Sequence, residues 1–387
     1  MTRLRRTALI IGLIATSLAG CATSPLPNLA PGERPETTSD EAGLWMVMDR
    51  EEERLKTSGN LVRDPQLNAY VRDLVCKLAG PRCGEIRVYI VREPRFNASM
   101  APNGTMIVWT GTLLRARNEA QLAAILAHEL SHYIRRHSLQ NWRDARSKTT
   151  ALTFVQLAAG SSVIGAIAPL FTYASIMANS RENEREADSL GQQIMVENGY
   201  DPSQAAAIWR QLVRENAAAD EPDSRIAFLD SHPASEERLQ AMQTGAAQML
   251  ATGFAGKLAT EEYRAAVLPY RGQYLKDDLA LAQYRRSAEL LAMLKEDGAS
   301  LSELQYFEGE LYRQRNKEGD AERAITAYRQ AAGDQQVPPE LHRSLGLVYM
   351  KTGQTDEARR ELQRYLNQRP DAPDRKVIGQ MLGQGGN

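Results

Sequence analysis

The sequence predicts a mainly α-helical protein with a small β-sheet, followed by an all-α domain of helical repeats. Helix start signals recur along the chain, as where Asp64 supplies an N-cap and Pro65 a first-turn proline. Two short stretches, 86–91 and 105–109, have the pattern of strands. The last third repeats a pattern of Gly, Ala and Tyr at spacings of 34 to 37 residues.

The N-terminus has the pattern of an export signal rather than of folded structure. Arg3, Arg5 and Arg6 precede an apolar run at 8–18, which is too short for a comfortable permanent membrane span. The run ends in Leu-Ala-Gly-Cys21, which resembles the lipobox of bacterial lipoproteins. We therefore predict a signal peptide at 1–20 and lipidation of Cys21, and the alanine after it favours the outer membrane. An ordinary cleavable signal with an incidental cysteine is the alternative.

Residues 21–40 are expected to tether the folded part to the membrane, because four prolines lie there among small polar residues. Export places the chain in an oxidising compartment. The two remaining cysteines, Cys76 and Cys83, are therefore expected to form a local disulfide. Two free buried thiols or a metal pair are the alternatives, and the lack of a further Cys or His nearby in sequence disfavours the metal pair.

The next elements are expected in the order helix, helix, strand, hairpin and helix. Ala42–Leu55 has a helical pattern, and the helix that opens at Asp64 continues to about Leu78. Strand 86–91 follows, and a Pro-Asn-Gly turn at 102–104 leads into strand 105–109. Asn118 caps the helix that comes next.

That helix carries the motif His128-Glu129-Leu-Ser-His132. Residues four apart on a helix differ by about 40° in direction, so both histidines can bind one metal ion. Glu129 lies about 100° from His128 and reaches toward a metal-bound water. This is the zincin arrangement, in which one zinc lowers the pKa of water to about 7 and the glutamate is the general base. A surface helix with stray histidines is the alternative, and the apolar flanks of the motif disfavour it.

A catalytic zinc site uses three protein ligands. His137 lies five residues past His132, about 140° round the helix, so we expect a surface or packing histidine. Glu184 and Asp188 are also four apart and share a helix face. Glu184 can complete a His2Glu site, and Asp188 can accept a hydrogen bond from a ligand histidine. The flanking Glu182 and Glu186 are expected to be solvated charges that face away from Glu184.

Residues 149–180 contain no charged side chain and are numerous enough to cross a bilayer. The segment is interrupted by Gly160, Gly165 and Pro169. A buried or flap-like helical hairpin near the active site is favoured, with a membrane-surface or partner-contact segment as the alternative. A transmembrane helix is disfavoured because Leu, Ile, Val and Phe are sparse.

The last third holds two copies of one pattern. Positions in the second helix of each copy are offset by 34 residues and those in the first helix by 37. The copies consist of Gly309, Tyr312, Ala324, Tyr328 and Ala331, and of Gly346, Tyr349, Ala358, Leu362 and Tyr365. This spacing resembles the tetratricopeptide (TPR) consensus, so we predict a linker at 251–272 and a TPR-like domain at 273–387. Stacked helix pairs leave a concave groove suited to extended protein segments.

The motif and the sequence Ser-Arg-x-x-Glu184-x-x-Ala-Asp188, which follows some fifty residues later, resemble the HtpX and CAAX-prenyl-endoprotease type of zinc metallopeptidase. This gluzincin family resemblance covers roughly residues 41–245, and we assign 41–250 to a zincin-type metallopeptidase domain. The resemblance implies that Glu184 is the third zinc ligand and that Asp188 supports a ligand histidine.

The family also has a Ser/Thr-His-Pro segment with a later Arg, matched here at His232 and Arg238. The resemblance implies that His232 lies near the zinc. There it could stabilise the tetrahedral intermediate or occupy the open metal position, and a helix N-cap turn is the alternative. Arg238 is expected to bind either the substrate carbonyl or an acidic partner. Asn97 begins a segment like the family's substrate-pairing edge strand, which makes Asn97 a substrate-binding candidate. An ordinary core hairpin is the alternative there.

These features and the resemblance together predict a periplasmic zinc metalloendopeptidase, anchored to the outer membrane as a lipoprotein, that cleaves misfolded or misassembled envelope proteins. A TPR-based chaperone or assembly factor for outer-membrane proteins, with latent protease activity, is the alternative. The expected partners are unfolded envelope proteins, the outer-membrane protein assembly machinery and the membrane. Nucleic acid is not expected, since the net charge is −1 and no long basic block occurs.

Overall fold

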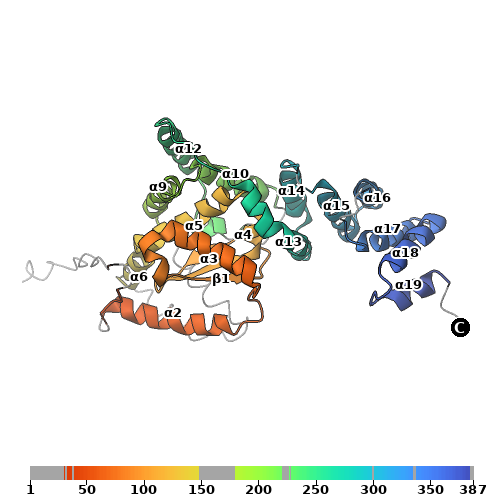
Figure 1. Ribbon diagram of the computed structural model, residues 1–387, viewed down its shortest axis with the longest axis horizontal. Coiled ribbons are helices and arrows are strands. Elements are labelled where there is room, and N and C mark those ends of the chain that lie inside the picture. Colours follow the sequence, from red (N-terminus) through yellow and green to blue (C-terminus); the bar gives the residue numbers. More distant parts are fainter. Residues whose placement is uncertain are drawn as a thin grey trace, which may run out of the picture.

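The computed structural model describes residues 30, 33–36, 39–147, 179–219, 226, 228–298, 300–333 and 337–383. Its first part packs helices around a small sheet, and its last part is a series of helices that extends away from the first (Figure 1). The predicted fold class, mainly α with one small sheet ahead of an all-α repeat region, is confirmed.

The sheet has three strands in the order β1-β3-β2. β1 (Arg87–Val91) runs parallel to β3 (Thr105–Trp109), whereas β2 (Ala98–Met100) runs antiparallel to β3. All five residues of β3 are buried because it is the central strand. Among the described residues β2 pairs with no strand other than β3, so its second edge is open to a further strand.

Helices cover both faces of this sheet (Figure 1). α2 (Asp40–Lys56) lies on one face, where Met48 and Leu55 form an apolar cluster with the side chains of β1 and β3 that point toward this helix. α3 (Pro65–Ala79) and α5 (Glu119–Ile134) lie on the other face. The sheet is therefore buried on both faces.

α3 begins as its sequence predicts. The Asp64 carboxylate accepts a hydrogen bond from Leu67 N (2.9 Å), and Pro65 occupies the first turn. The 3-10 helix η1 (Gly80–Glu85) follows, and a disulfide joins Cys76 to Cys83 with their Cα atoms 4.5 Å apart. This bond ties the end of α3 to the turn that enters β1.

α5 is the central helix of the first part and is buried from its start through His132. Asn118 caps it by accepting a hydrogen bond from Gln121 N (2.9 Å). α9 (Arg181–Glu197) crosses α5 closely, since a Cβ added to Gly191 would lie 3.3 Å from His128 N. Close crossing at a glycine brings the acidic sequence of α9 beside the motif on α5.

Among the described residues, the remaining helices of the first part are α4 (Thr110–Arg115), α6 (His137–Ser147), α10 (Ser203–Ala217), α11 (Phe228–Ser231) and α12 (Glu236–Leu250). Within the described ranges, every helix is too short or too polar to cross a membrane. The expectations for the signal peptide, for Cys21 and for nearly all of the uncharged segment 149–180 fall outside the described residues.

The last part is a stack of helices, in which two helix pairs correspond to the two copies of the repeat. The helices are α13 (Thr260–Leu279), α14 (Tyr284–Lys295), α15 (Leu301–Arg315), α16 (Asp320–Ala331), α17 (Glu340–Lys351), α18 (Thr355–Gln368) and α19 (Arg375–Met381). Two glycines at matching repeat positions explain part of the pattern. A Cβ added to Gly309 would lie 2.5 Å from the Tyr328 ring, and one added to Gly346 would lie 2.7 Å from Leu362 Cγ. Each pair thus depends on a residue without a side chain.

A buried group of charges joins the two parts. Arg115 Nη2 on α4 donates to Glu215 Oε1 on α10 and to Asp278 Oδ1 on α13, both at 2.7 Å. Arg286 Nε on α14 lies 3.2 Å from Glu215 Oε1, and Ser287 Oγ donates to Asp278 Oδ2 (2.6 Å). The four charged side chains are at most 3% exposed, so this junction is desolvated.

Candidate metal centre

The motif histidines share one side of α5, as the helical spacing predicts. His132 Nε2 lies 3.1 Å from His128 Nε2, and both side chains are buried. Glu184 in the first turn of α9 lies opposite them, with carboxylate oxygens 3.5 Å from His128 Nε2 and 3.4 Å from His132 Nε2. Two nitrogens and a carboxylate therefore face a common point.

This donor set fits a zinc ion. Ligand atoms held tetrahedrally at about 2.0–2.2 Å from zinc lie about 3.3 Å apart, close to the separations found here. Ligand atoms of His128, His132, Glu184 and His232 all lie within 4.8 Å of one another, and all four side chains are buried. Although burial opposes it, His232 and hydrogen bonds with the two motif histidines hold the pKa of Glu184 far below its usual range. A permanently ionised carboxylate is suited to a cation.

Glu129 lies beside this point without being one of the four donors. Its carboxylate is 3% exposed, and burial raises the pKa of the carboxyl group. The backbone of Met100 on β2 lies close to this carboxyl group and offsets a small part of the rise in its pKa. The edge strand therefore lies beside the residue that the motif predicts as the general base.

Asp188 and Arg238 lie behind His128. Asp188 Oδ1 is 3.1 Å from His128 Nδ1, and Arg238 donates to both oxygens of Asp188 (2.8 and 2.9 Å). Arg238 Nη1 is also 2.9 Å from Glu184 Oε2. Of the two roles left open for Arg238, the structure shows binding to acidic partners, because its side chain is buried against them. The Trp209 ring, which no sequence signal marks, lies 4.7 Å from the guanidinium and 5.7 Å from the His128 ring.

His232 reaches the same point from the segment after α11. Its Nδ1 lies 3.0 Å from Glu184 Oε1 and 3.3 Å from His128 Nε2, while its Nε2 lies 3.7 Å from Glu129 Oε1. The ring stacks on Phe228 (4.5 Å), which stacks on Trp209 (5.4 Å). The segment therefore does more than cap α12, a role that Ser235 performs.

Of the two alternatives for His137, a surface or a packing histidine, the structure shows the packing one, since this residue is fully buried. The helical-wheel argument did not predict that it would face the site. Its Nδ1 lies 2.9 Å from His132 Nδ1, and its Nε2 lies 3.2 Å from Glu186 Oε2, so Glu186 does not face away either. The helical-wheel argument failed because α5 ends at Ile134 and Arg136 has the left-handed φ of 59°. The chain turns there and brings His137 back against His132.

The free edge of β2 runs beside Glu129. In the antiparallel pair, Trp109 N donates to Asn97 O (3.0 Å) and Ala101 N to Thr105 O (2.8 Å). Hydrogen-bonded pairs alternate along such a ladder, so the backbone groups of Ala98 and Met100 point to the free edge. Asn97 directs its backbone to Trp109 and Thr112, away from that edge. The edge positions are thus one residue removed from the candidate Asn97.

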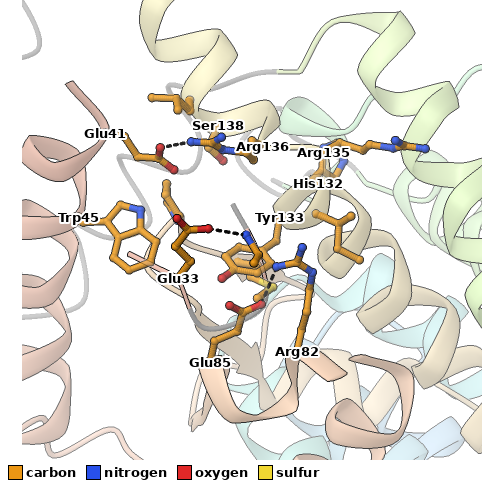
Figure 2. Close-up of a pocket in the computed structure, with 15 residues that line it drawn as sticks. Glu33, Glu41, Trp45, Arg82, Glu85, His132, Tyr133, Arg135, Arg136 and Ser138 are labelled. Atoms are coloured by element: carbon orange, nitrogen blue, oxygen red, sulfur yellow. Dashed lines mark hydrogen bonds and ion pairs between the residues drawn. The ribbon is translucent and has the colours of Figure 1, made fainter. Parts of the chain in front are cut away.

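A cavity of about 230 Å³ adjoins His132 (Figure 2). Trp45 and Tyr133 supply aromatic walls, and Figure 2 shows ion pairs between Arg136 and Glu41 and between Arg82 and Glu85 at its rim. Met100, Pro102, Ile134 and Leu139 add apolar surface. A space of this size beside a candidate metal ligand can hold a peptide side chain.

The fold and this donor set define the class of the chain, a metallopeptidase domain followed by helical repeats. Residues 61–246 match Peptidase family M48, and residues 316–376 match the tetratricopeptide repeat. Residues 61–246 therefore form a domain of the peptidase M48 type, which confirms the predicted family resemblance.

Relatives share part of this chain. The mitochondrial metalloendopeptidase OMA1 of Schizosaccharomyces pombe is 30% identical over 157 residues, which are 40% of this chain and 45% of that protein. The beta-barrel assembly-enhancing protease of Escherichia coli is 27% identical over 256 residues, which are 62% and 51% of the two chains. The protein of the same name from Yersinia pestis is 26% identical over 243 residues, 59% and 48%. The chain thus spans about half the length of these curated relatives.

Proposed function

We propose that this protein is a zinc-dependent endopeptidase that hydrolyses peptide bonds in misfolded or misassembled proteins of the bacterial cell envelope. The observation that carries the proposal is the convergence of His128, His132 and Glu184 on one point with the buried Glu129 beside it. A structural histidine cluster would not require a carboxylate ligand and a second, separate carboxylate at the same place.

Different residues of the site would have different roles in hydrolysis. His128, His132 and Glu184 would hold the zinc, which when bound polarises the scissile carbonyl and lowers the pKa of water. Glu129 accepts the proton of the attacking water and returns it to the leaving amine. Burial raises the pKa of Glu129, which makes its carboxylate a better proton acceptor than an exposed one.

The free edge of β2 is suited to align the substrate. An extended peptide that pairs with the outward backbone groups of Ala98 and Met100 adds a fourth strand to the sheet. Met100 lies beside Glu129, so the paired peptide would lie next to the general base. Backbone pairing of this kind favours unfolded segments and requires little side-chain specificity.

His232 supports a closed arrangement of the site. Its Nδ1 lies among the proposed metal ligands, where water or a substrate carbonyl would otherwise approach. Because its ring belongs to a stack with Phe228 and Trp209, His232 leaves only when the segment carrying it moves. We propose that this movement opens the site for substrate.

The envelope location and the substrate class rest on two further features. The N-terminal sequence has the lipobox pattern that ends at Cys21, which supports a lipid anchor and the periplasmic side of the outer membrane. Two of the relatives are named beta-barrel assembly-enhancing proteases, which supports misassembled outer-membrane proteins as substrates and their assembly machinery as a partner.

A second function, chaperoning or assembly with latent proteolysis, is favoured by one observation in addition to the closed His232. A cavity of about 580 Å³ lies between α13, α15 and α17 in the repeat region. Tyr306 and Phe307 line it together with Arg313 and Arg343, so it offers both apolar and charged contacts to an extended chain.

The decisive experiment compares wild type with Glu129→Gln, which keeps the size of the side chain but cannot accept the proton. Zinc content is measured by metal analysis, and cleavage is followed on a denatured outer-membrane β-barrel protein. A second pair carries His232→Ala in both members, so that a closed site cannot hide the activity. We expect equal zinc in all four proteins and cleavage only where Glu129 is intact. Stoichiometric zinc without any cleavage that depends on Glu129, in either pair, would overturn the protease and leave the assembly function.

A further inference from the structure

The two proposed histidine ligands have different hydrogen-bond partners at their Nδ1 atoms. His128 Nδ1 meets the Asp188 carboxylate directly at 3.1 Å. His132 Nδ1 meets another imidazole, that of the fully buried His137, at 2.9 Å between the two Nδ1 atoms. His137 Nε2 in turn lies 3.2 Å from Glu186 Oε2, and Glu186 Oε1 lies 2.8 Å from Arg135 Nε.

The hydrogen-bond roles in this chain follow from the metal. A histidine that binds a metal through Nε2 carries its proton on Nδ1, so His132 Nδ1 must donate. His137 Nδ1 must then accept, which places the proton of His137 on Nε2. That N–H faces Glu186, whose carboxylate accepts it. Every donor along the path meets an acceptor when the proton positions are those that metal binding requires.

A different role for His137, as a metal ligand itself, does not fit the geometry. The His137 atom nearest the site faces His132 Nδ1, which is the nitrogen directed away from His128 and Glu184. The four side chains whose ligand atoms lie within 4.8 Å of one another do not include His137. The position of His137 is set by the turn at Arg136, and its burial excludes water that could replace it as the acceptor.

We propose that His137 and Glu186 are positioning residues, which orient His132 and fix its proton on Nδ1 so that Nε2 is available to the metal. This role rests on the proposed function only through zinc binding, not through peptide hydrolysis. His137 thereby accepts the Nδ1 proton of His132, as Asp188 accepts that of His128. On the His132 side the carboxylate is that of Glu186, which lies beyond the His137 ring.

Three substitutions test the proposal by zinc affinity, measured as competition between the full chain and a chromophoric chelator. His137→Leu removes the acceptor and should weaken zinc binding by about 10- to 100-fold, as loss of such a partner does in other zinc sites. His137→Asn keeps an acceptor oxygen near the position of Nδ1 and should restore most of the affinity. Glu186→Gln should weaken binding by about two- to fivefold, a modest effect because this carboxylate is 45% exposed.

The matched control is Glu182→Gln, an exposed glutamate on the same first turns of α9, which should leave zinc affinity unchanged. The visible spectrum of the cobalt(II)-loaded protein reports ligand geometry, and His137→Leu should change it while His137→Asn should not. Circular dichroism of the metal-free proteins checks folding. If His137→Leu does not fold, the zinc affinities of His137→Asn and Glu186→Gln relative to the control still test the positioning role.

Three results would overturn the proposal. They are unchanged zinc affinity in His137→Leu, a loss in His137→Asn as large as in His137→Leu, or equal effects of Glu186→Gln and Glu182→Gln. Failure of the proposed function is a separate outcome, since wild type would then bind no zinc or would bind it without hydrolysing peptides.

Discussion

Replacing Arg115 by methionine should destabilise the protein strongly, because Arg115 is the centre of the buried charges between the two parts. Its guanidinium donates to Glu215 and Asp278, and also to the carbonyl oxygens of Pro94 (3.0 Å) and Gly111 (3.2 Å). Methionine has a similar length and fills most of the space. The substitution therefore removes the charge and its hydrogen bonds rather than the packing.

The expected loss in the free energy of unfolding depends on the partners that the two carboxylates keep. Removing one partner of a buried ion pair costs about 3–5 kcal/mol, since the other charge stays desolvated. Two carboxylates are affected here, but Arg286 still lies 3.2 Å from Glu215 and Ser287 still donates to Asp278. We therefore expect a loss of about 3–4 kcal/mol in the free energy of unfolding, a large fraction of the about 5–15 kcal/mol typical of a domain.

Urea denaturation measures this loss. All four tryptophans lie between residues 45 and 209, so their fluorescence reports on the metallopeptidase part, while circular dichroism reports on helices throughout. The control is Arg92→Met, which breaks the pair of Arg92 with Asp277, the residue next to Asp278. Arg92 is 52% exposed, so its loss should cost at most about 1 kcal/mol. Equal costs for the two substitutions would refute the assignment of Arg115 to a desolvated junction.

Three further predictions concern the site, the sheet and the repeats. His232→Ala should raise the rate of peptide cleavage, because it empties the position among the metal ligands; a fall of about 100-fold or more in kcat would instead show that His232 stabilises the transition state. Glu52→Gln should lower the free energy of unfolding by about 3 kcal/mol at pH 7. Burial alone would raise the pKa of Glu52, but hydrogen bonds from Arg87 and its neighbours hold that pKa at about 2 instead of 4.5. That cost should shrink as the pH falls from about 4.5 toward 2, where the carboxylate protonates, and a pH-independent cost in denaturation experiments would contradict it. Gly346→Ala should lower the free energy of unfolding by about 1–3 kcal/mol through overpacking. Gly379→Ala on α19, where nothing lies within 4 Å of the added methyl group, should raise it by about 0.5–1 kcal/mol. The reverse order of stabilities in thermal denaturation would contradict the repeat packing.

Features with a regular period could be predicted from the sequence. The helical spacing places His128 and His132 together on α5, and it places Glu184 and Asp188 on one face of α9. The repeat spacing locates the glycines at which helices approach each other. In each case one rule of helix geometry applies over the whole distance that separates the residues.

Features that depend on where a helix ends could not be predicted in this way. His137 faces His132 because α5 stops at Ile134 and Arg136 is left-handed, and an arginine gives no signal for that conformation. Trp209 reaches the site from α10 through tertiary packing alone, with no motif in its surroundings. The resemblance to a family predicted the approach of His232, whereas spacing within the chain could not.

The short strand β2 has a consequence for the products of the reaction. Backbone groups that point to its free edge recur at every second residue, at Ala98 and Met100. A peptide paired along this edge can therefore slide only in steps of two residues without losing its hydrogen bonds or turning its side chains over. Because Met100 on this strand lies beside Glu129, each step would present a new bond to the same base. On the proposed pairing, a long unfolded substrate should yield nested fragments whose ends differ by even numbers of residues.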